Sequence, residues 1–425
     1  MTSADTATLK KDYKKLVTIG ILNMAQTFPA AFTGTALPFL FRKEGLPLEM
    51  FWLLALPTMP TWLRWLMALA VDNFGSERFG HRKSWIVPCT LVGTAAYALL
   101  AFIPPSLPAL HLIVAILLFK AFVMVAQDVT IDAYAAESMT SAERAAGTSI
   151  INWLAGIAGV LGTGTVALVE TFGWQPTMLG AAALMFIAAT PAMIRPEPPV
   201  PEARKKRQAS GQRASIWRTF KRPESSYILP FALFWGFGAA FMGTMLGPFY
   251  ADKGLTLTEF GILSPISHLA GSTLAAVTTP LLVERFGLRK TALIGVAVLP
   301  IEGAMFCTFA LTSLPSLPVL IAMVSLLAYA TALFTYPVTI SRYRWASKAQ
   351  AGTDYALQSS LAGFGVWTAG SVSGLVASQV GWVYFFPIAT AIALTAGVIY
   401  VGKFNRIEQL VIERERVELE STPST

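Results

Sequence analysis

The segment Glu77-Arg78-Phe79-Gly80-His81-Arg82-Lys83 returns 207 positions later as Glu284-Arg285-Phe286-Gly287-Leu288-Arg289-Lys290. Nearly the same offset relates Ala146-Gly147-Thr148 to Ala351-Gly352-Thr353, and Gly173-Trp174 to Gly381-Trp382. Three repeats in the same order and at the same spacing indicate that the chain consists of two homologous halves.

The composition places these halves in a lipid bilayer. Hydrophobic residues make up 54% of the chain, charged residues 13%, and the mean hydropathy is +0.57, whereas about 25% of the residues of a soluble domain are charged. Each half contains about six apolar stretches long enough to cross a hydrocarbon core about 30 Å thick. The sequence therefore predicts an all-α membrane protein with twelve transmembrane helices in two pseudo-symmetric six-helix bundles, the arrangement from which secondary transporters build a central site.

The repeat divides the chain into four predicted parts. Residues 1–194 form the N-terminal bundle and residues 226–403 the C-terminal bundle. Residues 195–225 form a cytoplasmic linker, which carries a Pro-rich run and the cluster Arg204-Lys205-Lys206-Arg207. Residues 404–425 form a cytoplasmic tail. The basic cluster either binds a partner or, as we favour, lies on anionic lipid headgroups and helps to set the topology.

The net charge of +8 is distributed in a way that indicates topology and not nucleic-acid binding. With the twelve predicted spans, only Arg42, Lys43 and Lys253 lie on one side, and Arg64 and Lys120 lie within spans. All other Lys and Arg residues lie on the side of the two termini. This positive-inside pattern predicts a multi-pass protein of the bacterial inner membrane with both termini in the cytoplasm.

Several function classes lack their usual sequence signals. Cys89 and Cys307 both fall in apolar spans, and the three histidines, His81, His111 and His268, show no metal-ligand spacing. A Gly-x4-Gly-Lys-[Ser/Thr] phosphate loop and a nucleophile beside a base are also absent from the sequence. We therefore expect no enzyme activity, no cofactor, no metal site and no ATP-driven step, and we expect a monomer.

Small residues line two of the predicted spans. We expect these residues to let helices pack closely, and contact with a ligand is the alternative. Either role would also suit a surface along which the two bundles slide. The positions are Gly156, Gly159, Gly162 and Gly164 in the fifth span and Gly363, Gly365, Gly370 and Gly374 in the eleventh.

Charges near the cytoplasmic surface suggest a gate. Asp72 closes the second span and is followed by a Gly turn and a basic pair, while the second copy has Thr279 at the equivalent position. Asp128 and Asp132 lie four residues apart in the fourth span, so their carboxylates share one helix face. We expect a gate or salt bridges here, with direct proton, cation or substrate binding as the alternative for the two carboxylates. The predicted gating residues are Asp72, Arg82, Lys83, Asp128, Asp132, Arg144, Glu284 and Arg289.

Polar residues deeper in the spans are candidates for substrate or proton binding, because charges there are costly. Arg64 lies mid-span in the second helix, Lys120 in the fourth and Glu302 in the ninth. A buried cation attracts an anionic ligand, and a buried carboxylate can carry a proton. The alternatives are an internal ion pair for Arg64 and a peripheral position for Glu302. The predicted substrate or proton residues are Arg64, Lys120, Glu302, Asp354, Tyr336 and Trp235.

The loop after Asp72 resembles the inter-helix motif of the major facilitator superfamily. A narrower resemblance, over essentially the whole chain, is to the AmpG muropeptide permeases and their relatives, which include acetyl-CoA carriers. It is carried by Gly80-His81-Arg82-Lys83-Ser84-Trp85, Ala126-Gln127-Asp128, Asp132-Ala133-Tyr134 and Glu143-Arg144-Ala145-Ala146-Gly147. His81 departs from this group, which often has an Arg there. The segment Ala351-Gly352-Thr353-Asp354-Tyr355-Ala356-Leu357-Gln358 is most similar to the rhizobactin and pyochelin siderophore permeases.

These resemblances imply the major facilitator fold and a small-molecule transporter that works by alternating access. We expect proton-coupled import of a siderophore, free or ferric, with protons as the coupling ion. A muropeptide permease is the nearest alternative, and an exporter of a siderophore or drug would use the same fold. A membrane receptor without transport would leave the repeated gate motif unexplained.

The distribution of basic residues predicts the topology directly. Reporter fusions at Lys206 and in the C-terminal tail should report the cytoplasm, and a fusion near Gly254 should report the opposite side. A periplasmic signal from the Lys206 fusion would contradict the twelve-span topology.

Overall fold

The computed structural model describes residues 12–76, 78–139, 143–194, 216–347 and 351–420. The side chains of some helical residues within these ranges, those of Asp72 and Arg144 among them, lie outside the description. The N-terminal half contains α1 (Tyr13–Ala31), η1 (Phe32–Ala36), α2 (Leu37–Lys43), η2 (Leu48–Met50), α3 (Trp52–Ala55), η3 (Leu56–Leu63), α4 (Arg64–Asn73), α5 (Lys83–Leu100), η4 (Leu107–Ala109), α6 (Leu110–Ser138), α7 (Arg144–Phe172) and α8 (Trp174–Ile194). The C-terminal half contains α10 (Ile216–Phe220), α11 (Ser225–Asp252), α12 (Leu257–Leu311), α13 (Leu317–Trp345) and α14 (Ala351–Glu420).

The described helices are consistent with twelve membrane crossings. Nine of them are long and apolar enough to cross a bilayer. Two of these nine, α12 and α14, each contain two crossings that meet at a non-helical glycine, Gly287 or Gly381. The remaining crossing is the stretch from η2 to α4, where Pro57 and Pro60 remove backbone donors and the chain forms a 3₁₀-helix instead of an α-helix.

The turns between helices in one half have counterparts in the other half, as the sequence motifs do. Every positive-φ residue in the described chain is a glycine, and these glycines form three pairs at nearly the repeat spacing. The φ angles are 86° and 87° at Gly45 and Gly254, 93° and 79° at Gly80 and Gly287, and 83° and 70° at Gly173 and Gly381. Only glycine adopts this conformation without a Cβ clash, so the repeated glycines preserve the same helix reversals in both halves.

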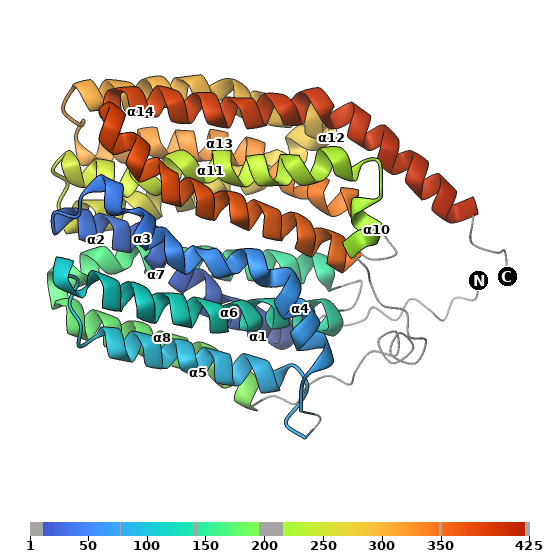
Figure 1. The fold of residues 1–425 in the computed structure, drawn as a ribbon, viewed down its shortest axis with the longest axis horizontal. Coiled ribbons are helices and arrows are strands. Elements are labelled where there is room, and N and C mark those ends of the chain that lie inside the picture. The colour runs from blue at the N-terminus through green and yellow to red at the C-terminus, as the bar shows by residue number, and fades with distance from the viewer. Residues whose placement is uncertain (1–11, 77, 140–142, 195–215, 348–350, 421–425) are drawn as a thin grey trace.

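The two halves lie side by side, the blue-to-green half below and the yellow-to-red half above, with their helices roughly parallel (Figure 1). Helix α1 begins and α14 ends at one end of this bundle, which we call the terminal end (Figure 1). The loop between α4 and α5 lies at the same end. The turn between α11 and α12 lies at the other, which we call the opposite end.

Helix α14 extends beyond the boundary predicted at residue 403. It continues to Glu420, and Ile407 and Val411 pack into a buried cluster of the C-terminal half. The guanidinium of Arg414 pairs with Glu224, 2.7 Å away, and its side chain is only 10% exposed. The last turns of α14 are therefore held against the start of α11, a contact that the sequence pattern did not indicate.

Several glycines of the predicted stripes mediate close packing. Within the halves, a Cβ at Gly162 would lie 2.5 Å from the carbonyl oxygen of Phe28, and one at Gly365 would lie 2.3 Å from that of Leu233. Between the halves, a Cβ at Gly374 would lie 2.3 Å from the carbonyl oxygen of Leu48. These helices therefore approach to a distance that only a residue without a side chain permits. Gly156, Gly159 and Gly164 are exceptions: the nearest atom to a Cβ at Gly156 or Gly164 lies 3.8 Å away, and nothing lies within 4 Å of one at Gly159.

An ion pair and an aromatic stack join the halves at the opposite end. Arg42 of α2 donates from Nη2 to Asp252 of α11 at 2.9 Å, and the indole of Trp382 donates to the same carboxylate at 2.9 Å. The rings of Phe39 and Phe260 stack with centroids 4.0 Å apart. These contacts hold the two bundles together at the opposite end of the interface.

Gly365→Ala should destabilise the protein, because the new methyl group would meet backbone atoms of α11 that cannot move aside. Overpacking of this kind costs about 1–3 kcal/mol. The melting temperature of the purified protein in detergent should fall. Gly402→Ala, in the same helix but with open space around the new methyl group, should leave it unchanged or raise it. Equal melting temperatures for the two variants would contradict close packing at Gly365.

Arg42→Gln or Asp252→Asn should open the opposite end more often. Both side chains of the pair are about a quarter exposed, and such pairs are worth about 1 kcal/mol, which corresponds to a several-fold change in population. In a background without Cys89 and Cys307, Thr58→Cys should react several-fold faster with a thiol reagent applied from the side of the opposite end. Lys253→Gln is the matched control, because Lys253 binds carbonyl oxygens of its own half and should not change this rate.

Candidate substrate and coupling site between the halves

Three charged side chains form a group on the N-terminal half. Arg64 is the first residue of α4, where the 3₁₀-helix ends, and it donates from Nη1 to Asp128 and from Nη2 to Asp132 of α6, the latter at 2.6 Å. The side chains of Arg64 and Asp128 are 24% and 22% exposed, whereas that of Asp132 is 57% exposed. The spacing of four residues places both carboxylates within reach of one guanidinium. We call these residues the acidic trio, because their formal charges sum to one negative charge.

A second group, on the C-terminal half, contains a buried arginine between aromatic rings. Arg342 of α13 is 5% exposed. Its guanidinium carbon lies 5.1 Å from the ring centroid of Trp235 and 5.2 Å from that of Tyr355, and Nη2 donates to Ser359 at 2.9 Å. The ring of Tyr355 stacks on that of Tyr343, with centroids 4.3 Å apart. We call Arg342, Trp235, Tyr343 and Tyr355 the arginine–aromatic group.

The two groups face each other across the boundary between the halves. Tyr355 interacts electrostatically with Arg64 as well as with Arg342, and Tyr343 does so with Asp132. The two guanidiniums also repel each other across this boundary. Trp62 and Phe364 meet nearby, with ring centroids 6.0 Å apart. Together the two groups form an inter-half cluster in which each half contributes an arginine.

A small cavity lies elsewhere on the same boundary. Its volume is about 40 Å³, and its lining is mostly apolar, with Thr33, Thr58, Thr244 and Gly370 among the residues that line it. This space holds a few water molecules at most. A larger molecule does not fit in this cavity unless its walls move apart.

Each half is also tied internally by an ion pair near the start of its first long helix. Lys15 of α1 lies 2.7 Å from Glu143, just before α7, and Arg222, just before α11, pairs with Asp354 of α14. Lys15 and Arg222 are separated by the repeat offset of 207. The first pair joins α1 to the start of α7, and the second joins the start of α11 to α14, the corresponding helices of the other half.

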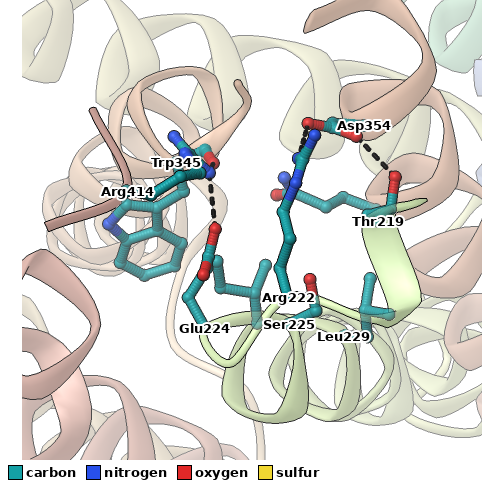
Figure 2. Close-up of a pocket in the computed structure, with 10 residues that line it drawn as sticks. Thr219, Arg222, Glu224, Ser225, Leu229, Trp345, Asp354 and Arg414 are labelled. Carbon is teal, nitrogen blue, oxygen red and sulfur yellow. Dashed lines mark hydrogen bonds and ion pairs between the residues drawn. The ribbon is translucent and has the colours of Figure 1, made fainter. Parts of the chain in front are cut away.

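Asp354, predicted as a substrate or proton residue, lies in this tie and not in the inter-half cluster. It is 2% exposed, and it accepts hydrogen bonds from Thr219 at 2.6 Å and from the backbone N–H of Ser347 at 2.9 Å. Figure 2 shows its carboxylate beside Arg222 and Thr219, next to the separate pair of Glu224 and Arg414. Its surroundings are those of a residue that holds α10, α13 and α14 together.

The other predicted substrate or proton residues are dispersed. Arg64 and Trp235 lie in the inter-half cluster. Lys120 is 4% exposed inside the N-terminal half, with its ammonium group 5.3 Å from the ring centroid of Tyr97. Glu302 accepts a hydrogen bond from Thr331 at 3.3 Å, and Tyr336 donates to the carbonyl oxygen of Ser272 at 3.2 Å; both contacts lie within the C-terminal half.

The predicted gating residues fall into three sets. Asp128 and Asp132 lie in the acidic trio. Arg82 is 3% exposed at the start of α5, with Lys83 as the first residue of that helix. In the second copy Glu284 is exposed, and Arg289 donates to the carbonyl oxygen of Val401 at 2.8 Å. The side chains of Asp72 and Arg144 lie outside the described residues.

Sequence reasoning missed Arg342, Tyr343 and Tyr355 as members of the site. Arg342 lies near the end of α13, two residues before Arg344, and a basic residue there matches the positive-inside pattern. The two differ in burial, since the side chain of Arg344 is 54% exposed and pairs with Glu408. The adjacent aromatic residue Tyr343 was the available signal.

The comparisons with known proteins agree with this architecture. Residues 19–299 match the family model of the Major Facilitator Superfamily. The anhydromuropeptide permease of Escherichia coli K12 is 25% identical over 385 residues, which cover 88% of this chain and 76% of that protein. A transporter named AmpG 4 of Rickettsia felis is 25% identical over 410 residues, covering 91% of this chain and 95% of that protein.

Solved structures support the fold alone, because their sequence identities are low. A mutant of the nucleoside transporter NupG has a TM-score of 0.69 at 16% identity, covering 92% of this chain and 99% of that one. The inward-open xylose transporter XylE from E. coli has a TM-score of 0.68 at 14% identity, covering 91% and 95%. The predicted fold class is thereby confirmed. This chain belongs to the major facilitator superfamily and is a multi-pass membrane transporter.

Proposed function

We propose that this protein carries a peptidoglycan fragment of the muropeptide type across the bacterial inner membrane, driven by a proton gradient. The relatives from E. coli and R. felis support this cargo, since the similarity covers most of this chain. The observation that carries the mechanism is the acidic trio, an ion-paired group on the boundary between the two halves. The terminal end is proposed to face the cytoplasm, in agreement with the positive-inside pattern.

Siderophore import, which the sequence motif favoured, becomes the second candidate. Its support is the segment 351–358, which forms the first turns of α14. In that segment Asp354 serves the internal tie, and Gln358 donates to the carbonyl oxygen of Arg342 at 3.5 Å. These contacts give Asp354 and Gln358 a role in folding, so these two residues of the motif carry less weight for the cargo than the similarity to muropeptide permeases does.

The acidic trio can couple a proton to the movement of the halves. Two carboxylates share one guanidinium, so the group has one negative charge in excess, which a proton neutralises. Asp132 is the more exposed carboxylate, so a proton would reach it first. Protonation removes one of the two ion pairs of Arg64 and frees part of its guanidinium to interact across the boundary.

The remaining predicted gating residues are proposed to control the terminal end. Arg82 and Lys83 in the first copy, and Glu284 and Arg289 in the second, lie at the two repeated helix reversals around Gly80 and Gly287. Asp72 and Arg144 are proposed to act with them. Charged contacts at this end would close it when the opposite end opens, as alternating access requires.

Uptake by whole cells tests the cargo. Cells deleted for this gene should lose uptake of a radiolabelled anhydromuropeptide, and a protonophore should abolish uptake in the complemented strain. Uptake of a ferric siderophore by the same cells should be unchanged. Loss of siderophore uptake together with normal muropeptide uptake would contradict the muropeptide assignment and support siderophore import.

Asp128→Asn and Asp132→Asn test the coupling role. Each removes a negative charge that the proton is proposed to neutralise, so proton-driven accumulation should fall about tenfold or more, while the amount of protein in the membrane stays normal. Exchange of labelled for unlabelled cargo needs no net proton movement, so the variants should retain it. Glu413→Gln, at an exposed carboxylate outside the cluster, is the control. Full accumulation of cargo by both Asp variants would show that the acidic trio does not couple protons to transport.

A further inference from the structure

Arg342 differs from three partly buried arginines whose ion pairs the structure describes. Arg64, Arg222 and Arg414 each pair with at least one carboxylate. Arg342 is 5% exposed, and its contacts among the described residues are the hydroxyl of Ser359 and two aromatic faces. A buried cation without an anion is costly, so such a group is usually kept for an anionic ligand.

Two N–H donors in this group have no acceptor among the described residues. They are Nε of Arg342 and the indole Nε1 of Trp235, and both atoms are buried. A buried donor without an acceptor costs free energy, and a carboxylate offers oxygens that can accept from both. Hydrogen bonds from a guanidinium to a carboxylate are also among the strong ones in proteins.

The position of Arg342 strengthens this argument. Its guanidinium and that of Arg64 repel each other across the boundary between the halves. An anion bound at Arg342 would relieve this repulsion. It would also attract Arg64 away from Asp128 and Asp132. Binding of an anion to the C-terminal half would then weaken the ion pairs of the acidic trio in the N-terminal half.

We propose that Arg342, with the indole N–H of Trp235, binds a carboxylate group of the cargo. This inference rests on the proposed function in one respect: the carboxylate would come from the peptide part of a muropeptide. A ferric chelate built from hydroxycarboxylates would present the same chemistry. The rings of Trp235 and Tyr355 keep the guanidinium in place while its donors engage the anion.

A purely structural role for Arg342 makes a different prediction. The cation–π contacts join α11, α13 and α14, so they could simply stabilise the C-terminal half. In that case substitutions would lower the melting temperature, but the protein would not distinguish a carboxylate from its amide. The decisive readout is therefore discrimination between acid and amide, and not loss of transport.

Binding to the purified full-length protein provides the test. The first probe is a radiolabelled anhydromuropeptide, compared with the same molecule after its peptide carboxylates are converted to amides. The second probe is ferric citrate, compared with a neutral ferric trihydroxamate. The variants are Arg342→Gln and Arg342→Lys, and Arg344→Gln is the matched control, because it removes the same charge from the same helix at an exposed site.

The wild type should bind the acid about tenfold or more tightly than the amide, as expected for loss of a buried charge-assisted contact. Arg342→Gln should abolish this preference by weakening the binding of the acid and not that of the amide. Arg342→Lys should keep part of the preference, and Arg344→Gln should keep all of it. The wild-type comparison needs no substitution, so it stands even where a variant folds poorly.

The possible results separate this inference from the proposed function. A preference that depends on Arg342 and appears only with the ferric carboxylate would sustain the site and overturn the muropeptide assignment. Muropeptide binding that is equal for acid and amide would leave the proposed function standing and overturn the carboxylate site. Absence of any carboxylate preference with both probes, or a preference that survives in Arg342→Gln, would also overturn it.

Discussion

A charge that is shielded from water is costly unless another charge or polar group compensates it. The pairs Lys15–Glu143 and Arg222–Asp354 provide this compensation at helix ends within each half, where they join α1 to the start of α7 and the start of α11 to α14. Two other ion-paired groups lie on the boundary between the halves, where they can break. Arg42–Asp252 and the acidic trio occupy the boundary between the halves, where ion pairs are partly exposed.

This division gives a physical basis for two rigid bundles that move against each other. Partly exposed ion pairs contribute about 1 kcal/mol or less each, so a few of them separate two states by an amount that a proton or a bound cargo can reverse. The glycines on the boundary supply a smooth contact surface. Gly374 against Leu48, and Gly261 against Ala167, bring the helices of opposite halves together without side chains that interlock.

The two halves share a scaffold but differ on the faces that meet. The reversals at Gly80 and Gly287, or at Gly173 and Gly381, are alike in conformation. In contrast, the N-terminal half presents two carboxylates around Arg64, and the C-terminal half presents Arg342 between aromatic rings. Repetition therefore fixes how the bundles are built, while the differences between the copies give the two facing surfaces different charges and are proposed to serve proton and cargo.

The sequence by itself determined the membrane class, the repeat and the family, because hydrophobic length and repeated glycine turns are local properties of the chain. It also singled out Arg64, Asp128 and Asp132, since charges within apolar spans are conspicuous. Only the tertiary structure decided that these three form one group and that Asp354 belongs to an internal tie. It also distinguished Arg342 from Arg344, two arginines on one helix. The physical reason is that burial and pairing depend on which separate helices meet in space, as Arg64 meets Asp128 and Asp132 and Arg344 meets Glu408. No local pattern specifies which face of a helix another helix will cover.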